Sequence, residues 1–239
     1  LWRTAWIYLS TGALTRLMRL RKGPIIAALY PVGCLLFQAM LAMLTGWVLF
    51  AALADRIPVA VAAAVGAAGG LAILRAGRAL DRWTFAYYLM QDYDYAARWH
   101  GAYGPDLQAR ITAFAQAIDA ARNDGFDEVL VVGHSSGAHL AVSALAEVPL
   151  RYDGPRLALL SLGQVVPMVT SLPEADALRQ HLSLAAQRRD LTWVDVTAPG
   201  DGCCFALCDP VAVSGVARPG DRGPLVFSAR FSQTLSPDR

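Results

Sequence analysis

The sequence predicts an α/β fold, a parallel sheet flanked by helices, with an N-terminal transmembrane helical hairpin in front of it. Two observations carry this prediction. An uncharged apolar run extends from Ile25 to Ala54. Further along, short apolar stretches alternate with segments of helical periodicity, and strands that alternate with helices form parallel sheets with right-handed crossovers.

Composition limits the classes of function. The 239 residues carry a formal net charge of +2, 55% of them are hydrophobic and 17% are charged. The chain is more apolar than an average soluble domain, and the excess is concentrated in its first third. The small net charge, without an arginine- or lysine-rich stripe interleaved with aromatic residues, argues against a nucleic-acid partner.

Residues 1–24 form a basic, apolar segment without any acid, "LWRTAWIYLSTGALTRLMRLRKGP". Leu14, Leu17 and Met18 recur at helical spacing. This pattern is typical of a juxtamembrane helix that lies on an anionic membrane surface. The alternative is an amphipathic helix that packs on the following domain.

Residues 25–75 predict a transmembrane helical hairpin. The run from Ile25 to Ala54 exceeds the roughly 20 residues that a helix needs to cross a bilayer. After the short connection "DRIP", the stretch Val59–Leu74 is rich in glycine and alanine, as suits a helix packed closely against a neighbour in lipid.

The charges flanking the hairpin predict its orientation. Basic residues precede the first span and follow the second, whereas the connection carries one acid and one base; the flanking residues are Arg16, Arg19, Arg21, Lys22, Arg75, Arg78 and Arg82. By the positive-inside rule both ends are cytoplasmic. The following domain is therefore expected on the cytoplasmic side of the inner membrane.

Residues 83–215 predict the α/β domain. Its apolar strands are "EVLVVG" (128–133), "RLALLSLG" (156–163) and "LTWVDVTA" (191–198), and helices are expected over 106–124, 138–147 and 174–189. A further strand is expected over 84–90, "TFAYYLM", followed by an aromatic loop over 91–105 that could form a pocket wall. Residues 216–239, rich in glycine and proline at their start, are expected to be a loop or tail.

The stretch Gly133-His134-Ser135-Ser136-Gly137 joins a predicted buried strand directly to a predicted helix. In that context G-x-S-x-G indicates a sharp turn that presents a serine hydroxyl beside a helix N-terminus. Ser135 is therefore the candidate nucleophile, and the N–H of Ser136 the candidate oxyanion donor. The alternative is a plain glycine-flanked turn.

With "GHSSGA" after "VLVVG", residues Trp83–Gly215 resemble the α/β-hydrolase superfamily, especially bacterial serine esterases and lipases. The hairpin lies outside this resemblance. The resemblance implies a triad in the order serine, acid, histidine. It favours Asp201, in the loop after 191–198, as the acid, with Asp209 as the alternative. Asp195 lies within a strand and is expected to be structural. Both candidate acids could instead form turns.

The histidine departs from the family pattern. The chain has only His100, His134, His139 and His181, and none follows Asp201. His134 is expected to point away from the serine, and His100 is the only one expected near a pocket rim. Without a base a serine hydroxyl is a poor nucleophile. The expectation is therefore that the sequence is a piece of a longer protein with its histidine beyond Arg239, or that the domain is a degenerate hydrolase.

No metal or cofactor is predicted. Cys203, Cys204 and Cys208 are close in sequence, but no histidine is nearby and a fourth ligand is missing. The predicted function is a membrane-anchored serine hydrolase that cleaves a lipid or other acyl ester, with the bilayer and an ester substrate as partners. The alternative is an inactive hydrolase-fold membrane scaffold. The sequence indicates nothing about oligomeric state.

Overall fold

A computed structural model describes residues 2–230. The chain forms two compact units. One is Ala28–Asp94, which contains the hairpin. The other combines the described residues up to Ala27 with those from Tyr95 onward. The hairpin unit thus extends as far as Asp94, and residues 2–27 group with the sheet.

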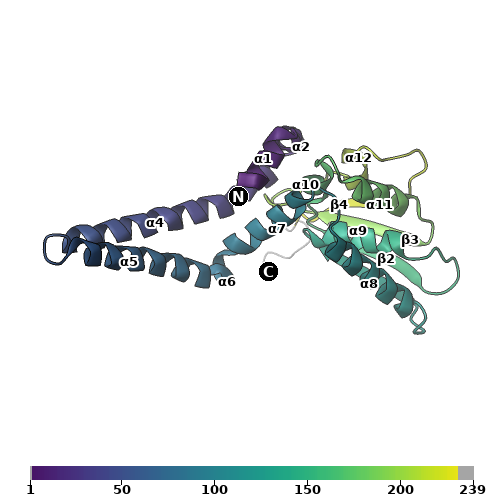
Figure 1. The fold of residues 1–239 in the computed structure, drawn as a ribbon. Helices are drawn as coiled ribbons and strands as arrows, with labels where there is room; N and C mark the ends of the chain where they lie inside the picture. The colour runs from purple at the N-terminus through teal and green to yellow at the C-terminus, as the bar shows by residue number, and fades with distance from the viewer. Residues whose placement is uncertain (1, 231–239) are drawn as a thin grey trace. The chain divides into compact units, whose positions relative to one another are not determined.

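The hairpin unit is built on two long helices, α4 (Tyr30–Leu53) and α5 (Val59–Ala79), which run side by side (Figure 1). Both are long and apolar enough to cross a membrane. Small residues allow their close approach: a Cβ on Gly66 would stand 2.6 Å from the carbonyl oxygen of Gly46, and one on Gly70 would stand 3.0 Å from that of Ala42. Outward-facing side chains such as Phe37 and Trp47 are largely exposed, as lipid-facing residues are.

The strand predicted over residues 84–90 is wrong, because these residues belong to two helices, α6 (Asp81–Thr84) and α7 (Ala86–Arg98). The Asp81 carboxylate accepts hydrogen bonds from the backbone N–H groups of Tyr87 (2.8 Å) and Tyr88 (3.2 Å) and so caps the first turn of α7. The predicted loop over 91–105 is correspondingly helical as far as Arg98.

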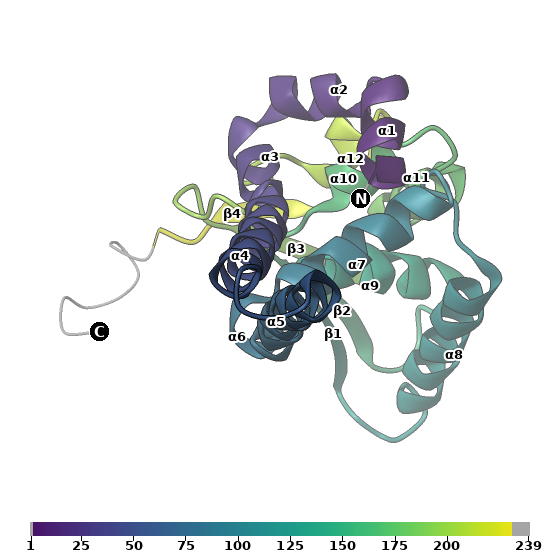
Figure 2. The same cartoon turned by 60° about the vertical axis from the view of Figure 1, so that its left-hand side comes forward.

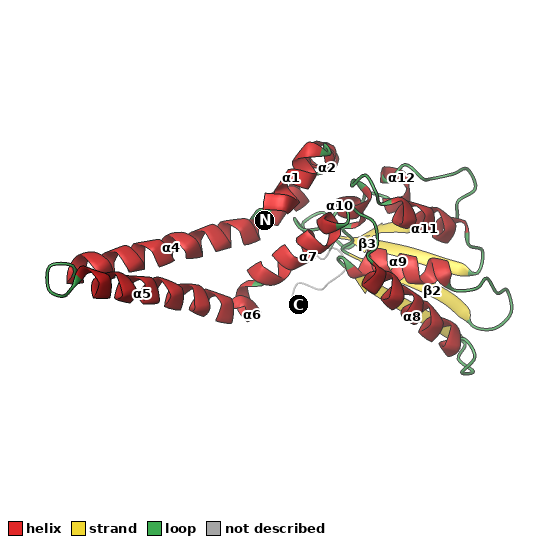
Figure 3. Ribbon diagram, in the orientation of Figure 1, coloured by secondary structure: helices red, strands yellow, loops and turns green. Residues whose placement is uncertain are grey.

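The second unit contains a four-stranded sheet (Figure 3) made of β1 (Glu128–His134), β2 (Arg156–Leu162), β3 (Leu191–Thr197) and β4 (Leu225–Ser228). The strands lie in sequence order and every pair is parallel. The first three strands confirm the prediction. β4 corrects it, because this strand lies inside the segment 216–239 that was expected to be loop.

Three helices cover one face of the sheet: α8 (Pro105–Ala121), α9 (Gly137–Glu147) and α11 (Asp176–Gln187). When parallel strands advance in one direction, right-handed crossovers place the connecting helices on one side. The opposite face is apolar yet exposed, with Leu130 at 55% and Phe227 at 54% exposure. The core therefore lies on one side of the sheet only.

The N-terminal helices α1 (Trp2–Ser10), α2 (Ala13–Leu20) and α3 (Lys22–Ala28) pack on the sheet domain, beside α10 (Val166–Thr170) and α12 (Pro210–Val213) (Figure 2). Leu17 is fully buried in a cluster with Leu172 and Phe205. The Tyr8 hydroxyl donates to the carbonyl oxygen of Met168 at 3.1 Å. The apolar side of this segment thus contacts protein. This agrees with the alternative prediction, an amphipathic helix that packs on the following domain.

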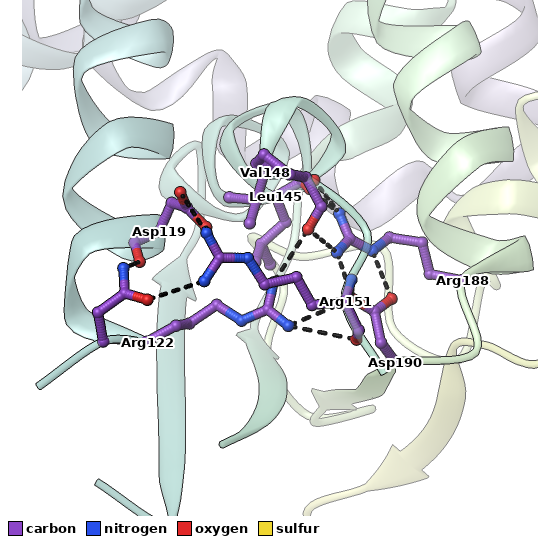
Figure 4. A network of polar contacts seen from close by, with 9 residues as sticks. Asp119, Arg122, Leu145, Val148, Arg151, Arg188 and Asp190 are labelled. Atoms are coloured by element: carbon purple, nitrogen blue, oxygen red, sulfur yellow. Dashed lines mark hydrogen bonds and ion pairs between the residues drawn. The ribbon is translucent and has the colours of Figure 1, made fainter. Parts of the chain in front are cut away.

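A buried network of polar contacts joins the chain at the amino end of the sheet (Figure 4). Arg188 donates to the carbonyl oxygens of Leu145 (2.6 Å) and Val148 (2.7 Å), at the C-terminus of α9. The same guanidinium forms two hydrogen bonds with the Asp190 carboxylate, of 2.9 and 2.6 Å. The Arg122 atom Nη2 lies 3.7 Å from the Asp190 oxygen Oδ2. This network locks α9, β3 and the end of α8 together.

Candidate functional site

The structure confirms a sharp turn between β1 and α9. β1 ends at His134, α9 begins at Gly137, and Ser135 between them has a left-handed φ of 56°. Its N–H donates to the carbonyl oxygen of Leu162 at 2.9 Å, which ties the turn to the end of β2. A non-glycine residue in this backbone region is uncommon and marks local strain that the surrounding contacts must hold.

Glycine is required at one end of the turn and not at the other. A Cβ on Gly133 would come within 2.7 Å of both the Cα of Ala138 and the carbonyl oxygen of Gly137, whereas a Cβ on Gly137 would meet nothing within 4 Å. Gly133 therefore lets the first turn of α9 close directly onto the strand. This contact holds Ser135 in its strained conformation.

The Ser135 hydroxyl is half-buried, and no hydrogen bond to it occurs within residues 2–230. Ser136 precedes the first residue of α9, at the helix end where the positive pole of the backbone dipoles lies. Negative charge that developed on a group bound beside Ser135 would be stabilised there. The oxyanion role of Ser136 stays a prediction.

Two polar side chains approach the loop that follows β2. Measured from the point where a Cβ would stand on Gly163, the Asp201 carboxylate oxygen Oδ2 lies 3.6 Å away and the His134 atom Nε2 lies 4.0 Å away. Gly163 itself has a left-handed φ of 54°. The carboxyl ends of β1, β2 and β3 thus bring the Asp201 carboxylate and the His134 ring each within 4.0 Å of the Cβ position on Gly163, and His134 directly precedes Ser135 in the chain.

His134 was expected only to point away from the serine, and its convergence with Asp201 was missed. It depends on the sheet register, which pairs His134 with Leu162, the residue before Gly163. No local pattern encodes that pairing. The signal that could have found it is the parallel arrangement itself, because parallel strands bring their carboxyl ends to one edge.

The two candidate acids have different surroundings. Asp201 follows β3, and its Oδ1 accepts a hydrogen bond from the backbone N–H of Cys203 at 2.8 Å. Asp209 caps α12, where its Oδ1 accepts from the N–H groups of Val211 (2.8 Å) and Ala212 (3.2 Å). Asp201 is thus the acid whose other oxygen reaches the Gly163 loop beside the Ser135 turn, whereas Asp209 caps a helix.

Asp195 is fully buried within β3, as expected of a structural residue. It accepts a hydrogen bond from the Ser161 hydroxyl at 2.5 Å, and Trp193 donates to the same hydroxyl at 2.9 Å. Its Oδ2 is buried without a hydrogen-bond partner among the described residues. Burial raises the pKa of Asp195 to about 6 despite the hydrogen bond from Ser161.

The remaining histidines lie elsewhere. His139 is buried in α9, and burial lowers its pKa to about 4. His181 lies on α11 beside the Tyr103 ring, with 6.1 Å between ring centroids, and burial lowers its pKa as well. His100 has a left-handed φ of 51°, and its carbonyl oxygen accepts from the N–H of Glu174 at 2.9 Å.

The loop that carries Asp201 is anchored by the N-terminal helices. Arg21 donates to the carbonyl oxygens of Pro199 (2.7 Å), Asp201 (3.3 Å) and Ala206 (3.3 Å). The N–H of Leu207 donates to the Thr197 hydroxyl at 2.9 Å and fixes the far end of the loop. The segment that leads into the first apolar helix therefore also positions the candidate acid.

The three cysteines of this loop differ in burial. Cys203 is exposed, Cys204 is buried and Cys208 is half-buried, and all are free thiols. Burial, reinforced by the Asp201 charge, raises the pKa of Cys204 to about 11, so this thiol is protonated at neutral pH. Across residues 2–230 no group of three histidines, cysteines or acids is placed to hold a metal ion.

Comparison with family models, with curated proteins and with solved structures finds no match to this chain. The resemblance to α/β-hydrolases therefore depends on the Ser135 turn and its surroundings alone.

Proposed function

We propose that this protein is a membrane-anchored serine hydrolase that cleaves an ester of a lipid or another acyl compound. The observation that carries the proposal is the Ser135 turn. Ser135 has a left-handed φ between a parallel strand and a helix N-terminus, and the helix backbone approaches Gly133 so closely that a larger residue would not fit there. Ser135 would attack the ester carbonyl, the ester C–O bond would break and the alcohol would leave with the serine proton, and water would then hydrolyse the acyl-enzyme to the free acid and restore the serine hydroxyl.

The chain order of the sheet supports the assignment. An α/β-hydrolase carries its acid after a later strand than its nucleophile. Here the strand before Ser135 is β1, and Asp201 follows β3, two strands further in the same parallel sheet. Asp201 is the proposed acid, with Asp209, which caps α12, as the alternative. The N–H of Ser136 is the proposed oxyanion donor.

The base is the open part of the mechanism. The family order puts the histidine after the acid, and residues 202–239 contain none. Within this chain His134 is the histidine whose ring approaches Asp201 at the Gly163 loop. A His134→Ala variant tests whether it assists. Slower reaction of Ser135 in that variant would assign a role to His134, and an unchanged rate would exclude one.

The experiment for the function itself is reaction of the full chain, in uncharged detergent, with a fluorophosphonate probe. We expect one labelled peptide, containing Ser135, which disappears in Ser135→Ala and persists in the matched control Ser136→Ala. The control tests reaction at the neighbouring hydroxyl while leaving its backbone N–H in place. A folded wild-type protein that stays unlabelled would contradict the proposal.

That negative outcome would favour the second candidate function, an inactive hydrolase-fold scaffold on the membrane. The absence of any histidine after Asp201 is the observation in its favour. If Ser135 does not react with the probe, the protein is either a folded scaffold or its Ser135 turn is disrupted. Melting temperatures of wild type and Ser135→Ala distinguish these two explanations. Equal, cooperative transitions indicate a folded scaffold, whereas a broad wild-type transition indicates a disrupted turn.

The anchor is the α4–α5 hairpin, and the basic residues at both of its ends favour a cytoplasmic position for the sheet domain. Cys203 is exposed and offers a native reporter. A membrane-impermeant maleimide should label it in inverted vesicles and not in intact cells, with Cys203→Ser as the control. Labelling in intact cells would reverse the proposed orientation.

A further inference from the structure

A pocket distinct from the Ser135 turn lies among α2, α10 and α12. It has a volume of about 520 Å³. Its polar lining comes from Arg16, Arg19, Thr170, Ser171 and Ser214. No acidic residue lines it in the described chain.

The two arginines lie three residues apart on α2, so their guanidinium groups project from the same side of the helix. Arg16 donates to the carbonyl oxygen of Ser171 at 2.6 Å, which holds it at the pocket wall. Arg19 forms no hydrogen bond or ion pair within residues 2–230. Because Leu17 between them is fully buried, α2 cannot turn these charges away from the pocket.

The lining suits a phosphate group. Guanidinium groups present several N–H donors in a planar fork that matches phosphate oxygens. Ser171 lines the same space, and the Ser214 hydroxyl donates to that of Thr170 at 2.8 Å. Pro167 and Val213 supply apolar wall for the organic part of a ligand. The volume exceeds what a bare inorganic anion needs.

In the sequence, the arginines of this pocket shortly precede the proposed membrane anchor. Five residues lie between Arg19 and Ile25, where the uncharged run begins, so the connecting chain spans at most about 20 Å. Basic residues that come within about 10 Å of an anionic bilayer attract its headgroups. The same pocket chemistry would also suit a soluble phosphate ester.

We propose that the pocket of Arg16 and Arg19 binds a phosphate-ester anion, a role separate from the chemistry proposed at Ser135. The full chain in uncharged detergent is titrated with inorganic phosphate, with dihexanoyl phosphatidylglycerol and with zwitterionic dihexanoyl phosphatidylcholine. The variant is Arg16→Gln/Arg19→Gln. The control is Arg75→Gln/Arg82→Gln, which removes the same charge from the basic residues that follow the second span.

We expect the Arg16/Arg19 variant to bind its anion at least about tenfold more weakly than wild type, because the loss of one hydrogen bond to a charged group lowers affinity about tenfold or more. The control variant should bind the anion as wild type does. Tighter binding of phosphatidylglycerol than of phosphate assigns a lipid headgroup; equal binding assigns a soluble phosphate ester. Equal weakening in both variants, or none in either, overturns the proposal. Arg19→Gln alone tests the site without disturbing the Ser171 contact.

Discussion

Asp190, directly before β3, and Asp195, near the carboxyl end of β3, have different polar surroundings. Asp190, at the amino end, is held by two hydrogen bonds from Arg188. Burial alone would raise the pKa of Asp190, but these bonds and the Arg151 N–H outweigh it and keep the pKa below its usual range. Asp195, toward the carboxyl end, has no cationic partner among residues 2–230, and burial raises its pKa to about 6.

The contrast extends to the backbone. The amino end satisfies the last carbonyl groups of α9 with a buried guanidinium and has left-handed backbone only at glycines, such as Gly125 and Gly154, in its described loops, whereas the carboxyl end carries a non-glycine residue, Ser135, in the left-handed region. Strain and incompletely satisfied polar groups are concentrated at functional sites, and their cost must be offset elsewhere in the fold. We infer that the amino end stabilises the domain and that the carboxyl end carries its chemistry.

The largest effect is expected from breaking the amino end. Arg188→Ala would leave the Asp190 carboxylate and two α9 carbonyl groups buried without their main partner, which typically costs about 3–5 kcal/mol. The measurement is the melting temperature in detergent, followed by intrinsic tryptophan fluorescence. The control is Arg189→Ala, an exposed neighbour, for which a change within about 0.5 kcal/mol is expected. Similar losses in both variants would refute the inferred division of roles.

The carboxyl end can be broken at one glycine. Gly133→Ala pushes a methyl group to within 2.7 Å of the α9 backbone, and overpacking of this kind costs about 1–3 kcal/mol. We expect loss of stability together with loss of fluorophosphonate labelling. Gly137→Ala is the matched control, since a methyl group there meets nothing within 4 Å. If Gly137→Ala were the more damaging change, the described turn would be incorrect.

How much of this could be predicted from sequence depends on how local each signal is. The three strands and the turn at Ser135 follow from short apolar runs that end in small residues, and they were predicted correctly. β4 was missed because Leu225–Ser228 is only four residues long and follows a glycine- and proline-rich stretch. Its strand conformation comes from pairing with β3, which no local pattern encodes.

Two other errors have distinct causes. The aromatic stretch before Met90 has strand propensity, but the Asp81 carboxylate caps its N–H groups and a helix forms instead. The amphipathic pattern of α2 is the same whether its apolar side contacts lipid or protein. The sequence is therefore compatible with contact to lipid or to protein. The buried cluster around Phe205 shows that the apolar side of α2 contacts protein.

A smaller effect on the free energy of unfolding, one that depends on pH, is expected from Asp195. Because the folded-state pKa of Asp195 is raised to about 6, its stabilising contribution is present below about pH 4 and is lost as the pH rises through about 6. Asp195→Asn removes this loss. Relative to wild type, we expect the variant to gain about 1–3 kcal/mol between about pH 4 and pH 7.

Melting temperatures across that pH range measure the gain. Exposed Asp153→Asn serves as the control and should show no such trend. A pH-independent difference between wild type and Asp195→Asn would show that Asp195 stays ionised in the folded protein.

The smallest effect concerns the link between the N-terminal helices and the loop of Asp201. Arg21→Gln removes donors to three loop carbonyl groups, but these groups are exposed or partly exposed and can bond to water instead, so the three bonds together contribute about 1 kcal/mol. The melting temperature should fall only slightly, whereas amide hydrogen exchange over residues 199–207 should accelerate about fivefold or more, because local opening becomes easier. Lys22→Gln, at the exposed neighbouring residue, should leave exchange unchanged. Unchanged exchange in Arg21→Gln would show that the loop is held by its own contacts, such as that between Leu207 and Thr197, and that Arg21 does not position Asp201.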